Sequence, residues 1–118
     1  MANEISINAT LRYSKSPTSA SLTTSFLADQ TGDKYQAGVQ IVGTVEEQLD
    51  KGDVGTIGYI AFRNLDVTNF VQMGRAAGAY SMDVKAGKGG VIPWGSATSP
   101  FVKANTAACE FEYLIIEA

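Results

Sequence analysis

Apolar and polar residues alternate with a period of two along most of this chain. The first such run places its apolar residues at Ile5, Ile7, Ala9, Leu11 and Tyr13. Successive side chains of a β-strand point to opposite faces, so this pattern predicts strands rather than helices. We predict strands over residues 3–14, 20–28, 35–45, 56–64, 68–73, 79–85, 100–104 and 108–117.

Turn-forming residues separate these runs at the spacing of about 8–12 residues that is typical of all-β domains. We therefore expect an all-β fold over residues 1–118, a single-domain antiparallel β-sandwich or jelly-roll-like barrel of about seven or eight strands. Strand count alone leaves jelly-roll and immunoglobulin-like topologies open. The terminal strands are regular enough to belong to the sheet.

Three local signals refine this expectation. Residues 56–64 are apolar on both faces, which favours a central strand. Pro93 lacks a backbone N–H, so any strand over 91–94 is expected at a sheet edge. Thr44 and Glu47 have the spacing of a capping box, so a single helical turn is an alternative there.

Composition limits the class of partner. Charged residues make up 18% of the 118 residues, which is below the usual quarter and favours a surface partly covered by another chain. The net charge of −3 argues against nucleic acid as the main partner. No apolar stretch approaches the roughly 20 residues of a membrane helix, and the N-terminus lacks the pattern of a secretory signal.

The residues that common catalytic and metal sites need are scarce. The chain has no His and one Cys, which excludes His-dependent triads and the usual zinc sites. Cys109 lies in an alternating run and is expected in the core. We therefore expect no enzyme, with no catalytic, cofactor-binding or metal-binding residues and no cofactor.

Two acidic groups offer alternatives to that expectation. The densest acidic cluster comprises Glu46, Glu47, Asp50 and Asp53. Its carboxylates could hold Ca²⁺, but their spacing does not match the twelve-residue calcium loop. We therefore favour a solvent-exposed acidic connection. Glu110 and Glu112 could form a carboxylate pair for glycoside hydrolysis. They share one face of an alternating strand, so we interpret that face as the solvent-exposed side of the strand.

Trp94 is the candidate interface residue, because it lies in a segment flanked by Pro and Gly, where a Trp can anchor a protein contact. The alternative is a Trp that folds back over the core. Asn64, Asp66 and Asn69 are turn formers, since their side chains can bond their own backbone. We expect Asn64 to Asp66 to form a hairpin turn, and these three residues with Gly74 to define the fold rather than a site.

Four segments are distinctive as a set: IVGTVEE (41–47), GDVGTIGY (52–59), FRNLDVTNFVQMG (62–74) and KANTAACEFEYLIIE (103–117). Together they resemble a group of small virion structural proteins encoded by tailed bacteriophages. The resemblance covers roughly residues 35–117 and supplies no catalytic residue.

The resemblance implies a noncatalytic β domain that assembles on the virus particle. The expected function is that of a capsid decoration or cement protein, made in the bacterial host cytoplasm and ending on the capsid surface of the virion. Expected partners are the phage major capsid protein or another virion protein, and further copies of the chain itself in a homo-oligomer, with a trimer favoured. The alternative is a tail- or fibre-associated module that binds a receptor or a glycan.

Overall fold

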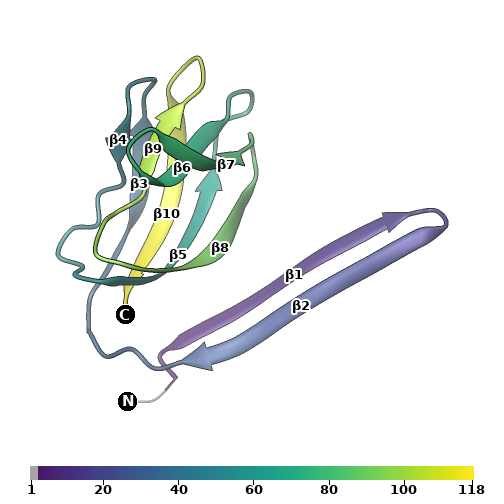
Figure 1. Ribbon diagram of the computed structural model, residues 1–118, viewed down its shortest axis with the longest axis horizontal. Coiled ribbons are helices and arrows are strands. Elements are labelled where there is room, and N and C mark those ends of the chain that lie inside the picture. The colour runs from purple at the N-terminus through teal and green to yellow at the C-terminus, as the bar shows by residue number, and fades with distance from the viewer. Residues whose placement is uncertain (1–2) are drawn as a thin grey trace. The chain divides into compact units, whose positions relative to one another are not determined.

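The computed structural model describes residues 3–118, which form ten β-strands and no helix (Figure 1). The chain divides into two compact units, Met1–Thr31 and Gly32–Ala118. The all-β, antiparallel fold predicted from the alternation is confirmed.

The first unit is a β-hairpin of two 11-residue strands, β1 (Ile5–Lys15) and β2 (Thr18–Ala28). The register runs without interruption from the Ile5–Ala28 pair to the Lys15–Thr18 pair. Within residues 3–118 these two strands pair only with each other. The expectation that the N-terminal strands join the sandwich sheet is therefore wrong.

The second unit contains two four-stranded antiparallel sheets. One has the order β3–β10–β5–β8, with β3 at Tyr35–Val42, β10 at Cys109–Glu117, β5 at Ile57–Asn64 and β8 at Gly89–Ser96. The other has the order β4–β9–β6–β7, with β4 at Glu47–Gln48, β9 at Phe101–Ala104, β6 at Val71–Ala76 and β7 at Ala79–Val84.

This strand order decides the topology. All connections between consecutive strands of the unit pass from one sheet to the other, except the β6–β7 hairpin. The first strand of the unit pairs with the last, and the second with the last but one. Eight antiparallel strands interleaved in this way form a jelly roll.

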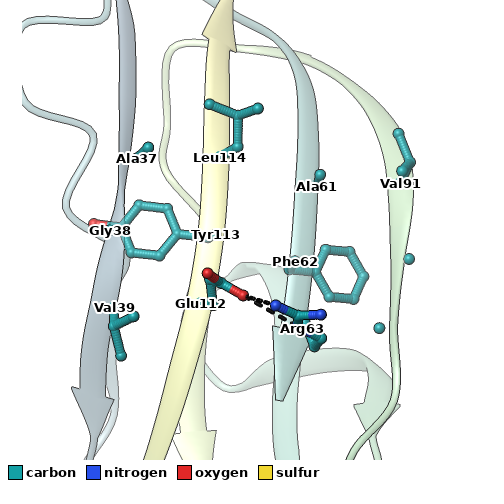
Figure 2. A pocket seen from close by; sticks show the side chains of 12 residues that line it. Ala37, Gly38, Val39, Ala61, Phe62, Arg63, Val91, Glu112, Tyr113 and Leu114 are labelled. Atoms are coloured by element: carbon teal, nitrogen blue, oxygen red, sulfur yellow. Dashed lines mark hydrogen bonds and ion pairs between the residues drawn. The ribbon is translucent and has the colours of Figure 1, made fainter. Parts of the chain in front are cut away.

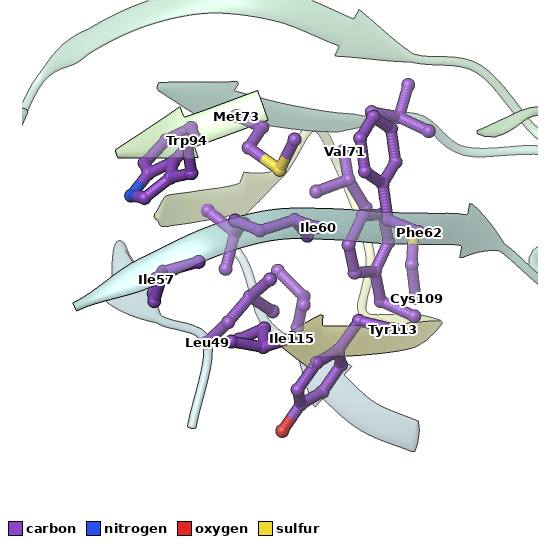
Figure 3. Packing of buried hydrophobic residues seen from close by; sticks show 14 of the residues in the cluster. Leu49, Ile57, Ile60, Phe62, Val71, Met73, Trp94, Cys109, Tyr113 and Ile115 are labelled. Atoms are coloured by element: carbon purple, nitrogen blue, oxygen red, sulfur yellow. The ribbon is translucent and has the colours of Figure 1, made fainter. Parts of the chain in front are cut away.

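The core lies between the two sheets (Figure 3). β5 and β10 contribute Ile57, Ile60, Phe111 and Ile115, and Met73 of β6 faces them from the other sheet, all essentially without exposed surface. Cys109 belongs to the same cluster, as its alternating context predicts. The predicted central position of β5 and the predicted edge position of the Pro93 segment are both confirmed by the sheet order.

Two local expectations are wrong. The hairpin turn predicted at Asn64 to Asp66 is wrong, because β5 and β6 belong to different sheets and residues 65–70 cross between them. The capping-box alternative also fails: Glu47 begins β4, and its carboxylate accepts hydrogen bonds from the Gly43 N–H at 3.3 Å and the Gln40 amide at 2.8 Å. The side chain thus closes a strand-to-strand connection instead of capping a helix.

Candidate functional surface

Asn64 lies at the end of β5 and is fully buried. Its Nδ2 donates to the backbone carbonyls of Asn69 at 2.9 Å and Val84 at 3.0 Å. Its Oδ1 accepts from the Asp66 N–H at 2.9 Å. One amide thus satisfies three backbone groups where the chain leaves one sheet for the other.

Asp66 and Asn69 complete the same crossing. Asp66 Oδ2 accepts from the N–H groups of Asn69 at 2.6 Å and Thr68 at 3.0 Å, and these bonds hold the pKa of Asp66 below its ordinary value. Asn69 Oδ1 accepts from the Thr106 hydroxyl at 2.8 Å. The structure therefore brings three of the four residues singled out as fold-defining into one hydrogen-bonded turn.

Gly74 lies apart from that turn, at a register shift between β6 and β7. A Cβ on Gly74 would lie 2.0 Å from the carbonyl oxygen of Ala79, a backbone atom that cannot move aside cheaply. Glycine is required there because the two backbones approach so closely.

Trp94 lies in the core with 6% of its surface exposed. Its indole N–H donates to the Thr98 carbonyl at 2.7 Å, and the Arg75 guanidinium lies 4.2 Å from the centre of the ring. Arg75 also donates to the Trp94 carbonyl at 2.7 Å. This is the position of a Trp folded over the core.

The acidic cluster is dispersed over separate partners. Glu46 accepts from the Tyr80 hydroxyl and the Gly78 N–H, and these two bonds lower its pKa. Asp50 accepts from the N–H of Gly52 at 2.9 Å. In residues 3–118 no group of His, Cys, Asp and Glu side chains is arranged to hold a metal ion.

The outer face of the β3–β10–β5–β8 sheet carries several exposed apolar side chains. Tyr35, Val39 and Ile41 of β3 are 70%, 54% and 66% exposed, so its alternating apolar residues face outward. The register continues this surface across the sheet, because Leu114 of β10 pairs with both Ala37 and Ala61, and Ala61 pairs with Val91 of β8. An apolar row therefore crosses all four strands.

A shallow hollow of about 790 Å³ lies over this sheet (Figure 2). Its lining includes residues with little or no side chain, among them Ala37, Ala61 and Gly89. Arg63 and Glu112 form an ion pair beside it, in which Arg63 Nε donates to Glu112 Oε1 at 3.1 Å and Nη2 donates to the same oxygen. Both side chains are substantially exposed, so the pair orients charge more than it stabilises the fold.

Sequence reasoning missed this surface. The signal was present in the alternation of residues 35–41, but a period of two does not say which face meets the core. The phase is decided by Val42, which is fully buried next to the exposed Ile41, and by Cys109, its partner in β10.

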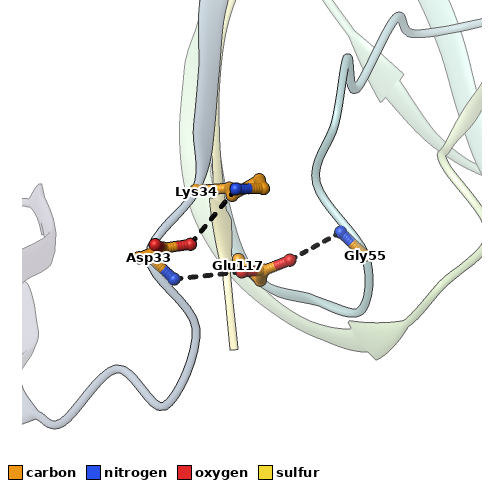
Figure 4. A network of polar contacts seen from close by, with 4 residues as sticks. All are labelled: Asp33, Lys34, Gly55 and Glu117. Carbon is orange, nitrogen blue, oxygen red and sulfur yellow. Dashed lines mark hydrogen bonds and ion pairs between the residues drawn. The ribbon is translucent and has the colours of Figure 1, made fainter.

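A polar clasp joins the first and last residues of the sandwich unit (Figure 4). The Glu117 carboxylate accepts from the N–H of Gly55 at 2.7 Å and of Asp33 at 3.1 Å, and the Gly55 bond is the main cause of its lowered pKa. The Gly32 N–H donates to the Ala118 carbonyl at 2.8 Å. These bonds fix the ends of β3 and β10 and thereby one end of the apolar face.

No family model, curated protein or solved structure matches the chain. Residues 3–118 contain no helix of the length and apolar character needed to cross a membrane.

Proposed function

We propose that this chain is a bacteriophage structural protein, a capsid decoration or cement protein that binds the outer surface of the capsid and stabilises the shell. The observation that carries the proposal is the exposed apolar face of the β3–β10–β5–β8 sheet. Contiguous apolar surface of this kind marks a site of protein contact. The jelly roll adds support by analogy alone, since the fold is common among viral shell domains.

The apolar face has the chemistry of a subunit or shell contact. It is formed by rigid strands, so little entropy is lost when it is covered. Its charged residues are Arg63, Glu112 and Glu110, and the first two already neutralise each other. The proposed partners are the major capsid protein or another virion protein, and other copies of the chain in a small cyclic oligomer, with a trimer favoured.

The proposal is tested by adding tagged protein to particles of the phage that encodes the chain, with heads and tails separated by sedimentation. We expect the protein to sediment with heads and to raise the temperature at which they release DNA. Val39→Asp should abolish binding, because it places a charge in the apolar face. The matched control is Val67→Asp, at a 92% exposed loop position, and it should bind normally.

A tail- or fibre-associated module is the second candidate, favoured by the hollow beside the Arg63–Glu112 pair. Paired charges next to an apolar floor are groups that can bind a glycan, and jelly rolls also occur among lectins. This candidate predicts binding to bacterial cells that is lost in Arg63→Ala, with sedimentation in the tail fraction. A protein that binds neither heads nor tails would contradict a virion role altogether.

A further inference from the structure

We propose that the apolar face of the N-terminal hairpin binds the same face of a second copy of this chain, with the two hairpins antiparallel. This inference rests on the proposed assembly role and names one of its contacts. It concerns β1 and β2 alone and does not use the outer face of the sandwich unit.

The hairpin is amphipathic. Residues that pair directly across two antiparallel strands share a face, so the register sorts the side chains into two sets. One face is apolar except for Thr24 and the Lys15–Thr18 pair at the tip, and comprises Ile5, Ile7, Ala9, Leu11, Tyr13, Ala20, Leu22, Phe26 and Ala28. The other face is polar except for Leu27, and is rich in Ser and Thr.

The middle of the apolar face is open to solvent. Leu11 and Leu22 pair with each other and are 76% and 74% exposed. A two-stranded hairpin is marginally stable in water, and three or more strands with a covered apolar face are needed for independent stability. Covering Leu11 and Leu22 would therefore stabilise the hairpin as well as the contact.

The distribution of charge points to a second hairpin as the cover. The four charged residues of the part of this unit that the structure describes are divided by position: Arg12 and Lys15 lie near the tip, Lys15 on the apolar face and Arg12 on the polar face, and Glu4 and Asp29 lie at the base. An antiparallel pair places each positive tip against a negative base. A parallel pair would place like charges together at both ends, which is unfavourable.

The size of the face predicts the strength of the contact. Strands of 11 residues are roughly 35 Å long at about 3.4 Å per residue, and the face of a two-stranded ribbon is about 10 Å wide. Ile5 at the base of the face is already buried, so two faces bury at most roughly 700 Å², which is below the ~1,200 Å² of a stable interface. The isolated pair should associate weakly, and attachment of many copies to one shell would strengthen it through effective concentration.

The first experiment measures the mass of the full chain by sedimentation over a wide range of concentrations. We expect the chain to associate in a concentration-dependent manner. Association should be at least about tenfold weaker in Leu11→Ser/Leu22→Ser, because the contact between two hairpins then loses the burial of four leucine side chains. The matched control is Leu27→Ser, which makes the same change on the polar face at a residue that is 58% exposed. It should associate like the wild type.

The second experiment determines orientation with cysteine variants and a thiol cross-linker spanning about 10 Å, the spacing of stacked sheets. Thr18→Cys lies at the tip and Ala28→Cys at the base of the apolar face. Cross-links should form when the two variants are mixed and not within Thr18→Cys alone. The wild type is the blank, because Cys109 is buried.

Three results would overturn the inference. They are a mass that does not change with concentration, equal association of the double variant and the wild type, and efficient cross-linking of Thr18→Cys to itself. The proposed function can be contradicted independently. A protein that associates through its hairpins but binds no particle would contradict only the virion role. If the wild type and Leu11→Ser/Leu22→Ser bind particles equally well and the wild type never associates with itself, only the hairpin contact is contradicted.

Discussion

Asn64 is the residue on which the crossing between the two sheets depends most. It is buried and makes three hydrogen bonds to backbone groups of residues 66, 69 and 84. Buried polar groups stabilise a fold only when they are paired, and removing one partner leaves the others unsatisfied. The cost of losing Asn64 therefore falls on several elements together.

We expect Asn64→Ala to lower the free energy of unfolding by about 2–4 kcal/mol, because two buried carbonyls and one N–H lose their partner. Urea unfolding followed by tryptophan fluorescence measures this change. Asn8→Ala, on the exposed polar face of the hairpin, is the matched control and should be neutral. A neutral Asn64→Ala would mean that water replaces the amide.

Acid should destabilise the sandwich unit through Asp66 and Glu117. Backbone N–H groups lower the pKa of both carboxylates, from ordinary values of 3.8 and 4.5. A carboxylate with a lowered folded pKa contributes stability above its unfolded pKa and loses it as the pH falls through the folded pKa. At neutral pH Asp66→Asn should be less stable than the wild type, and the difference should close in acid. A difference that is equal at every pH would contradict this.

Alkaline pH should destabilise the sandwich unit through ionisation of Tyr80. Burial and the bonded Glu46 carboxylate raise the pKa of Tyr80 from 10.0 to about 12. Its contribution to stability is complete below pH 10 and is lost as the pH rises from 10.0 towards 12. Melting temperatures measured across that interval should fall more steeply for the wild type than for Tyr80→Phe. Equal slopes would show that Tyr80 ionises at the same pH in the folded and unfolded states.

At the scale of elements, each strand of the β3–β10–β5–β8 sheet has one face against the core and one outside. β10 shows this most clearly, because Phe111, Tyr113 and Ile115 are buried while Glu110 and Leu114 are exposed. β5 is covered on its inner face by the second sheet and flanked on both edges by β10 and β8. A charge on its inner face would therefore have neither water nor a partner.

Ile60→Asp should unfold the sandwich unit, since Ile60 has no exposed surface and an unpaired buried charge costs several kcal/mol. The matched control is Val67→Asp, which makes a similar change at a 92% exposed position. Circular dichroism and melting of both variants test the assignment. Two folded variants of equal stability would contradict the position of β5 in the core.

At the scale of the whole molecule, the core of the sandwich unit is formed entirely from residues between Val42 and Ile115. The two compact units meet in sequence at Thr31 and Gly32. The clasp around Glu117 closes the sandwich unit with its own residues, from Gly32 to Ala118. We therefore expect the sandwich unit to fold without residues 1–31.

Deleting residues 1–31 should leave a sandwich that unfolds cooperatively, with a melting temperature within a few degrees of the full chain, since every residue of the cluster between the two sheets is kept. Calorimetry of both chains measures this. A shortened chain that does not unfold cooperatively would support instead one domain over residues 1–118.

The sequence alone determined most of the local structure of this protein. Eight of the ten strands in residues 3–118 follow from a period of two, and the burial of Cys109 and of the inner face of β5 follows from apolar runs. These are properties of neighbouring residues, which a sequence displays directly. The alternation predicts neither β4 nor the full length of β8. The expectation of a sandwich or jelly roll follows in the same way from the number and spacing of strands.

Only the tertiary structure decided which strands pair and which faces meet. It separated β1 and β2 from the sandwich, turned the predicted hairpin at Asn64 into a crossing between sheets, and placed Trp94 in the core. It also turned the apolar residues of β3 outward. The physical reason is that alternation defines two faces without saying which is covered, and strand pairing joins residues as distant as Val42 and Cys109.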